Sequence, residues 1–243
     1  MTRKYHIGTK FDSAAEHYDE QAIVQKEAAI QLVSMIQGLE KIHSAIDVGC
    51  GTGFASIEIL KHFPNLKLHL CDISQKMLEI ANHKLQDHNI IYTQCDVESE
   101  EFRTKYDLAI SNLCVQWFDD LEKFIQKILK ASKYFAFSTM LQGSFLEFSK
   151  IFETPGKPSP LLNCKTEKEL TNISQSLGKI INKQTKTFNL LFPSAQAAAM
   201  HFKKIGANLA QNNINNAFKL LNHRSNINLE YKIFFCLMEN KVD

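Results

Sequence analysis

The sequence has no long run of apolar residues. No segment approaches the ~20 apolar residues that a membrane-spanning helix requires, and the basic first residues are not followed by an apolar stretch of signal-peptide length. We therefore expect a cytoplasmic protein with no membrane partner. Repeats and low-complexity segments are missing too, and 44% apolar with 22% charged residues in 243 is typical of a globular chain with a buried core.

Paired cysteine motifs are also absent. The six cysteines include no Cys-x-x-Cys, so neither a zinc ribbon nor a thioredoxin-type dithiol is indicated. Four of them, Cys50, Cys71, Cys95 and Cys114, fall at or just beyond the ends of expected parallel strands, which raises the alternative of a metal site or redox switch. Cysteine in buried strands more commonly serves as a small apolar side chain, and we predict no metal.

The chain has almost no net charge. A value of +2 is too small to indicate a nucleic-acid binder, and we predict no nucleic-acid partner. Residues 1–140 carry 15 Lys and Arg against 19 Asp and Glu, whereas residues 141–243 carry 13 against 7. This asymmetry is consistent either with a negatively charged partner for the C-terminal part or with ordinary solvated faces.

An apolar strand runs directly into three alternating glycines in the stretch Ser44-Ala-Ile-Asp-Val-Gly-Cys-Gly-Thr-Gly53. Glycine has no Cβ atom, so Gly49, Gly51 and Gly53 can adopt positive φ and let a ligand approach the main chain closely. The pattern predicts a ligand-binding turn. The alternative is that the glycines only form a tight connection.

An acidic residue follows this turn at an informative distance. An amphipathic helix is predicted over 54–61, and a second strand over 66–71 ends at Asp72. This position is close to the ~20-residue offset at which a carboxylate meets ribose hydroxyls in nucleotide-binding βαβ units. The glycine turn and Asp72 together favour a nucleoside ligand.

The glycine spacing distinguishes between nucleoside ligands. Gly-x-Gly-x-Gly is one residue tighter than the Gly-x-Gly-x-x-Gly of dinucleotide sites. No third small residue is placed where it would let a pyrophosphate lie over the start of the helix. A nicotinamide oxidoreductase is therefore disfavoured. A strand followed by Asp-x-Gly-x-Gly-x-Gly, with an acid ending the next strand, resembles the signature of class I S-adenosylmethionine-dependent methyltransferases.

Strand and helix patterns alternate through the middle of the chain, which predicts an α/β fold with a doubly wound, mostly parallel Rossmann-like sheet. Beyond residue 140 the pattern changes to a last antiparallel pair with an inserted helix, after a proline-rich break over 155–160. Further strands are predicted over 90–95, 106–111, 133–139, 186–192 and 231–237, and further helices over 75–87, 121–129 and 194–205.

We interpret residues 1–243 as a single domain. Helical spacing over 11–37 places covering helices within residues 1–40, above the carboxyl edge of the sheet. Residues 41–140 then form the cofactor-binding core. Residues 141–243 supply helical insertions on the substrate side and the terminal antiparallel strands.

Three further stretches resemble the malonyl-acyl-carrier-protein O-methyltransferases of biotin synthesis. With the glycine turn, they span nearly the whole chain in the order of that family. The resemblance implies a seven-stranded class I fold, S-adenosyl-L-methionine as cofactor, and methyl esterification of a malonyl group on acyl carrier protein. The stretches are Phe11-x-x-Ala-Ala-x-x-Tyr18-x-x-x-Ala22-x-x-Gln25, Ser111-Asn-Leu-Cys-Val-Gln-Trp117, and Phe137-Ser-Thr-Met-Leu-Gln-Gly-Ser144 with Lys203-Lys-Ile-Gly-Ala207.

The resemblance also implies residue roles. The glycine turn should hold the methionine part of the cofactor, and Asp72 should accept from the ribose hydroxyls. The implied cofactor-binding residues are Asp47, Gly49, Cys50, Gly51, Gly53, Asp72, Ile73, Met77, Asp96, Val97, Asn112 and Leu113. The implied substrate-side residues are Tyr18, Gln25, Gln116, Trp117, Gln142, Ser144 and Lys203.

The chemistry implied by the resemblance requires no general base, because a free carboxylic acid is already ionised at neutral pH. We therefore predict no catalytic acid or base, only side chains that position the substrate. A buried carboxylate needs a cation or donors, for which we consider Lys203, Lys204, Lys133 and Arg224. Two alternatives stay open: methylation of a free di- or tricarboxylic acid, and a non-catalytic module that binds an adenosyl ligand.

Overall fold

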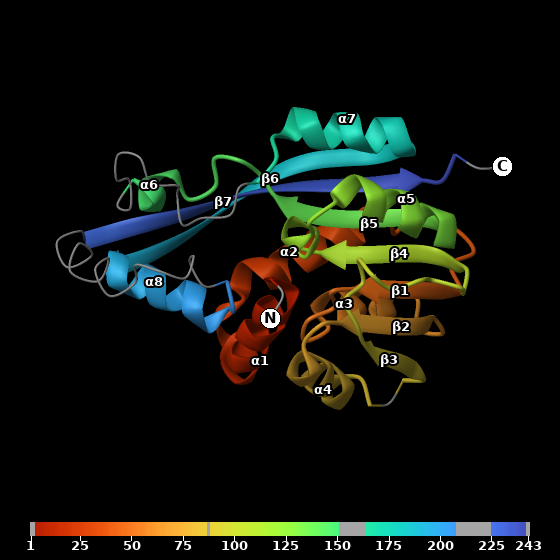
Figure 1. The fold of residues 1–243 in the computed structure, drawn as a ribbon, viewed down its shortest axis with the longest axis horizontal. Helices are drawn as coiled ribbons and strands as arrows, with labels where there is room; N and C mark the ends of the chain where they lie inside the picture. Colours follow the sequence, from red (N-terminus) through yellow and green to blue (C-terminus); the bar gives the residue numbers. More distant parts are fainter. Residues whose placement is uncertain (1–2, 87, 151–163, 208–224, 242–243) are drawn as a thin grey trace.

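The fold is built on one seven-stranded sheet with the strand order β3-β2-β1-β4-β5-β7-β6 (Figure 1). The computed structural model describes residues 3–86, 88–150, 164–207 and 225–241. Strands β1 to β5 are parallel, and β7 runs antiparallel to both β5 and β6. The strands are β1 (Ser44–Val48), β2 (Lys67–Asp72), β3 (Ile90–Gln94), β4 (Tyr106–Asn112), β5 (Ser132–Met140), β6 (Lys179–Ser194) and β7 (Ser225–Glu239).

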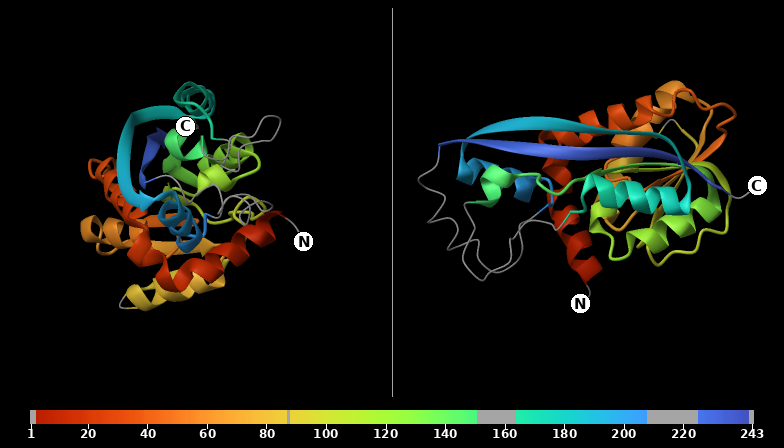
Figure 2. Two further views of the ribbon diagram at one scale, coloured as in Figure 1. Left: turned by 90° about the vertical axis from the view of Figure 1, so that its left-hand side faces the viewer. Right: turned by 90° about the horizontal axis from the view of Figure 1, so that it is seen from above.

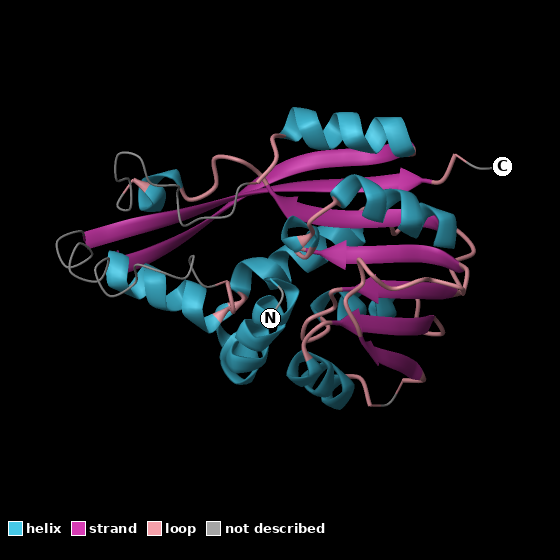
Figure 3. Cartoon of the chain, in the orientation of Figure 1, coloured by secondary structure: helices cyan, strands magenta, loops and turns pink. Residues whose placement is uncertain are grey.

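Helices cover both faces of this sheet (Figure 3). No helix in the ranges described is long and apolar enough to cross a membrane. The helices are α1 (Arg3–Gln21), α2 (Ile23–Ser34), α3 (Phe54–His62), α4 (Gln75–Lys84), the 3-10 turn η1 (Val115–Trp117), α5 (Leu121–Ala131), α6 (Leu146–Ser149), α7 (Glu167–Leu177) and α8 (Ala195–Lys204).

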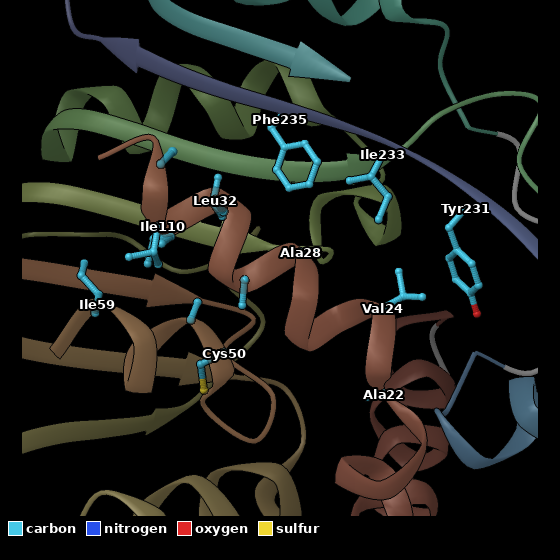
Figure 4. Packing of buried hydrophobic residues seen from close by; sticks show 14 of the residues in the cluster. Ala22, Val24, Ala28, Leu32, Cys50, Ile59, Ile110, Tyr231, Ile233 and Phe235 are labelled. Carbon is cyan, nitrogen blue, oxygen red and sulfur yellow. The ribbon is translucent and has the colours of Figure 1, made fainter. Parts of the chain in front are cut away.

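Two hydrophobic clusters form the core, one on each face of the sheet. Successive side chains of a strand point to opposite faces, so Ala45 joins one cluster and Ile46 the other. On the first face α2 buries Val24, Ala28 and Leu32 against the sheet (Figure 4). The second face is covered by α5, which packs an apolar stripe of Phe124, Ile125, Ile128 and Leu129.

The predicted doubly wound sheet is confirmed, and the differences lie at its ends. The first helix begins at Arg3 rather than near residue 11. Its first turn is held by contacts that no local pattern reveals, since Arg3 and Lys4 both donate to the Trp117 carbonyl. Strand β6 extends over 16 residues although its first half is polar. It is an edge strand whose side chains are largely exposed, so apolar alternation is not required there. The proline-rich segment 155–160 lies outside the described residues.

The last two strands extend past the rest of the sheet as a two-stranded arm. Strand β5 pairs with β7 only from Ile233 to Glu239, whereas β6 stays paired with β7 back to Ser225. Helices α6 and α8 pack against this arm (Figures 1 and 2). The arm buries Ile227, Leu229 and Tyr231 and so adds an apolar wall beside the carboxyl edge of β4 and β5.

Candidate active site

A cavity lies at the carboxyl edge of the parallel strands, beneath α1. It is the place where the crevice of an open α/β sheet is expected to bind ligands. Most residues that the sequence predicted for the cofactor line it: Asp47, Gly49, Cys50, Gly51, Asp72, Ile73, Met77, Asp96, Val97, Asn112 and Leu113. Four predicted substrate-side residues line it as well: Tyr18, Gln25, Gln116 and Trp117. The fold therefore brings together predicted residues from five separate segments of the chain.

The glycine turn uses left-handed backbone at three positions. Gly49, Gly51 and Gly53 have φ of 69°, 54° and 87°, a region that side chains disfavour. A Cβ atom on Gly49 would lie 2.0 Å from the Cys114 sulfur, so only glycine fits there. A Cβ on Gly51 would meet no atom within 4 Å, so this position opens onto free space in the cavity. Gly53 does not line the cavity; it precedes α3 as its N-cap.

The carboxylate of Asp72 shapes the turn as well as the cavity. Its Oδ2 accepts a hydrogen bond of 2.8 Å from the Gly51 amide, and its Oδ1 accepts one of 2.8 Å from the Ser74 amide. Burial raises the pKa of Asp72 to about 6, against the lowering effect of these donors. Each oxygen keeps a lone pair for another donor, as recognition of ribose hydroxyls would require.

The buried carboxylate of Asp47 is only half satisfied. Its Oδ2 accepts from the Ser56 hydroxyl at 2.6 Å, but its Oδ1 has no donor in the described part of the chain. Burial raises the pKa of Asp47 to about 7, and the Ser56 bond opposes this shift. An unpaired buried oxygen beside an open glycine turn fits a ligand that brings a donor or a cation. The ammonium group of S-adenosylmethionine is such a cation.

We expect cofactor affinity to fall as the pH is lowered through 7. The ionised form of Asp47 is the one that attracts an ammonium group, and protonation removes that charge. The dissociation constant of S-adenosylhomocysteine should rise by about tenfold between pH 8 and pH 6, measured by calorimetry.

The variant Asp47→Asn is the control for this pH profile. It should bind more weakly at pH 8 and lose the inflection near pH 7, keeping only the one that Asp72 contributes near pH 6. A wild-type affinity that is constant from pH 8 to pH 6 would exclude the assignment of Asp47.

A hydrogen-bonded network fixes the end of β4 beside the cavity. The Ser138 hydroxyl donates to Asn112 Oδ1 at 2.7 Å and accepts from the Leu113 amide at 2.9 Å. The Asn112 amide in turn donates to the Gln25 carbonyl of α2 at 2.9 Å. Leu113 has φ of 50°, which is uncommon for a residue with a side chain. Asn112 thus acts through its bonds to α2 and β5, which hold Leu113 in place.

Helix α1 is fastened to the loop after each of the strands β1 to β4. Lys4 pairs with Glu98 after β3, and its ammonium also donates to the Trp117 carbonyl after β4. Asp12 accepts from the Ser74 hydroxyl after β2 at 2.6 Å. Further along, Asp19 accepts from the Thr52 hydroxyl after β1 at 2.6 Å and pairs with Lys84 of α4. Helix α1 is therefore held along its length over the loops at the carboxyl edge of the sheet.

The far end of the cavity is apolar and aromatic. Tyr231 lines it from the arm, Phe202 from α8 and Phe145 from the residue before α6, with ring centroids 4.5 to 5.0 Å apart around Phe145. The Tyr231 hydroxyl is 2.8 Å from His201 Nε2 of α8. Burial lowers the pKa of His201 to about 4, so this pair stays neutral at physiological pH.

Tyr18 lies between the polar and the apolar ends of the cavity. Its ring stacks on Phe54 with centroids 6.3 Å apart. Burial raises the pKa of its phenol well above the usual range, so the hydroxyl stays a neutral donor. This hydroxyl makes no hydrogen bond within the described residues, which leaves it free to meet a bound ligand.

Three predicted substrate-side residues do not line the cavity. Ser144 instead accepts from the Lys232 amide at 3.1 Å and donates to Leu141, which ties the loop after β5 to β7. Gln142 lies in the same loop, and Lys203 is exposed on α8. Of the other cations considered, Lys133 lies at the opposite edge of the sheet and Lys204 is exposed, while Arg224 lies outside the described residues.

Several residues of the cavity were not predicted from the sequence. The sequence could have indicated Phe11 and Phe54, since Phe11 shares a helix with Tyr18 and Phe54 directly follows the glycine turn. It could not have indicated the residues of the arm, because β7 reaches the cavity only through its pairing with β5. The additional lining residues are Lys4, Ile7, Phe11, Thr52, Phe54, Ala55, Cys95, Cys114, Phe118, Met140, Phe145, Phe202, Ile205, Ala207 and Tyr231.

Comparison with known proteins agrees with this geometry. Residues 45–133 match the family model of a methyltransferase domain. Malonyl-acyl-carrier-protein O-methyltransferase 1 of Ilyobacter polytropus is 34% identical over 219 residues, which cover 88% of this chain and 81% of that protein.

Solved structures share the fold at low sequence identity. The YcgJ protein of Bacillus subtilis superposes with a TM-score of 0.59 at 17% identity, over 88% of this chain and 99% of that one. The N-methyltransferase NodS of Bradyrhizobium japonicum, in complex with S-adenosylhomocysteine, superposes with a TM-score of 0.55 at 10% identity, over 89% and 85% of the two chains.

Proposed function

Because the chain belongs to the malonyl-acyl-carrier-protein O-methyltransferase family, we propose that it transfers a methyl group from S-adenosylmethionine to the free carboxyl of a malonyl group carried by acyl carrier protein. The product is a methyl ester, formed early in biotin synthesis. In this proposal residues 41–140 bind the donor, and residues 1–40 and 141–243 enclose the acceptor.

The observation that carries the proposal is the continuity of the cavity. It runs from Gly51 and Asp72, where a nucleoside fits, to Phe145 and Tyr231, where the uncharged thioester end of the acceptor fits. Tyr18 lies between these ends. Donor and acceptor would therefore meet in one space that α1 covers.

The chemistry places modest demands on the protein. S-adenosylmethionine, when bound, supplies an electrophilic methyl group on a sulfonium. The acceptor carboxylate is ionised at neutral pH and needs no base. The chain must align its oxygen with the methyl group and exclude water, and such positioning contributes roughly 7–11 kcal/mol to lowering a barrier.

Residues in and beside the cavity suit these two tasks. The network of Asn112 and Ser138 holds Leu113 at the edge of the donor site. The Tyr18 hydroxyl is available as a donor to the acceptor carboxylate, because it has no partner among the described residues and its pKa keeps it protonated. In this proposal helix α1 and the aromatic rings of Phe145, Phe202 and Tyr231 keep water out of the space between.

Mass spectrometry tests the proposed function directly. Malonyl acyl carrier protein incubated with the enzyme and isotope-labelled S-adenosylmethionine should gain one labelled methyl group, which base hydrolysis of the ester releases as labelled methanol. Free di- and tricarboxylic acids serve as competing substrates in the same assay. Labelling of a free acid but not of the carrier would replace the proposed substrate, and labelling of neither would indicate binding without transfer.

We expect the reaction to be more salt-sensitive with the protein carrier than with a coenzyme A thioester. Residues 141–243 carry 13 Lys and Arg against 7 Asp and Glu, and an acidic carrier would be attracted to them over a Debye length of about 8–10 Å. Raising the salt concentration from 50 to 500 mM should lower kcat/KM for the carrier substrate several-fold more than for malonyl-coenzyme A. An equal response of the two substrates would exclude electrostatic attraction of the carrier.

A further inference from the structure

The outer face of α8 combines an exposed apolar side chain with two lysines. Met200 is 39% exposed, and Lys203 and Lys204 are exposed beside it. Residues three and four positions apart share one face of a helix, so the three side chains form a compact surface. Helix α8 contains no acidic residue that could neutralise it. We call Met200, Lys203 and Lys204 the α8 surface.

The inner face of the same helix belongs to the cavity wall. Phe202 lines the cavity from α8 itself, and Ile205 and Ala207 line it just beyond the end of the helix. Helix α8 contacts both α1 and the arm (Figures 1 and 2). A macromolecule bound to the α8 surface would therefore sit one helix thickness from the aromatic end of the cavity.

A purely structural role explains only part of this surface. Cations in the last turn of a helix interact favourably with the helix dipole, which accounts for lysines at positions 203 and 204. It does not account for the exposure of Met200 next to them. Methionine flanked by cations is suited to a partner helix that presents apolar side chains among carboxylates.

We propose that the α8 surface docks an acidic helix of the carrier protein that delivers the malonyl group. This inference rests on the proposed function and adds where the carrier binds. The lysines attract the carboxylates of the carrier, and Met200 contacts an apolar side chain between them. The thioester arm then enters the cavity past the end of α8, where Ile205 and Ala207 line the wall.

The test measures kcat/KM for two malonyl substrates, with the wild type and with the double variant Met200→Glu/Lys204→Glu. One substrate is the malonyl carrier protein, and the other is malonyl-pantetheine, which has the same thioester without the protein or its charges. We expect kcat/KM for the carrier to fall at least about tenfold, because two like charges now face its carboxylates. Turnover of malonyl-pantetheine should stay within twofold of the wild type.

A matched control places the same two changes elsewhere. The variant Ile91→Glu/Lys130→Glu also replaces one exposed apolar residue and one exposed lysine, on β3 and α5, and should leave both substrates unaffected. Equal loss with both substrates, or no loss with the carrier, would overturn the docking site. Failure of the wild type to methylate either substrate would instead overturn the proposed function, so the two results are distinguishable.

Discussion

Replacing Gly49 by alanine is expected to reduce cofactor affinity by on the order of a hundredfold or more. The new Cβ would lie 2.0 Å from the Cys114 sulfur and 2.6 Å from its Cβ, and the backbone at φ of 69° disfavours any side chain. Overpacking of this kind destabilises the folded protein by about 1–3 kcal/mol, and a left-handed residue with a side chain adds roughly 1–2 kcal/mol. The turn will therefore shift to relieve this strain. Because Gly49 joins β1 to the turn, relief of the clash would displace Gly51 and Asp72, which shape the donor site.

Calorimetry with S-adenosylhomocysteine measures this loss, and two further variants locate its cause. Gly38→Ala is the matched control, because a Cβ at that position meets no atom within 4 Å and the backbone is not left-handed. Its affinity should equal that of the wild type. Cys114→Gly combined with Gly49→Ala should recover the part of the loss that is due to the clash. Wild-type affinity in Gly49→Ala itself would show that the ligand does not lie against this turn.

Asp72→Ala is expected to weaken cofactor binding by about 1.5–3 kcal/mol, the range for hydrogen bonds to a charged group. Two effects contribute. The change removes the acceptor proposed for the ribose hydroxyls, and it leaves the Gly51 and Ser74 amides without the carboxylate that binds them at 2.8 Å. The loss should appear as a higher dissociation constant for S-adenosylhomocysteine.

An analogue without the ribose 2′-hydroxyl separates these two effects. If Asp72 accepts from the ribose, the analogue binds the wild type more weakly than the parent compound, while Asp72→Ala binds both equally. If Asp72 only organises the turn, the wild type and the variant lose the same amount with the analogue. That second result would contradict the ribose assignment.

The sequence predicted most of the cavity lining around the glycine turn, since the elements that form it are local. The glycine turn, the acid that ends β2 and the residues after β4 each follow a buried strand, and parallel strands end at a common edge. The fold thus follows from a pattern of short apolar strands and amphipathic helices. Leu113 is an exception in its conformation, because nothing in the sequence indicates that Ser138 holds it at positive φ.

Most residues at the aromatic end of the cavity were not predicted, because their contacts are distant in sequence. Tyr231 reaches the cavity from a strand that lies at the end of the chain, and Phe145 from a loop held to that strand. Lys203 was assigned to the substrate from its motif alone, but α8 turns Phe202 inward and leaves its neighbour in solvent. Which side of a helix meets the cavity depends on the arm, whose geometry the local pattern does not encode.

The contacts of α1 have a consequence for turnover. Lys4, Asp12 and Asp19 bind four different loops, and Phe11 packs against Gly206 beyond α8. We expect the spent nucleoside of the proposed reaction to leave more readily once these contacts are released. The energy that holds α1 over the cavity therefore also limits how fast the donor end of the cavity is emptied.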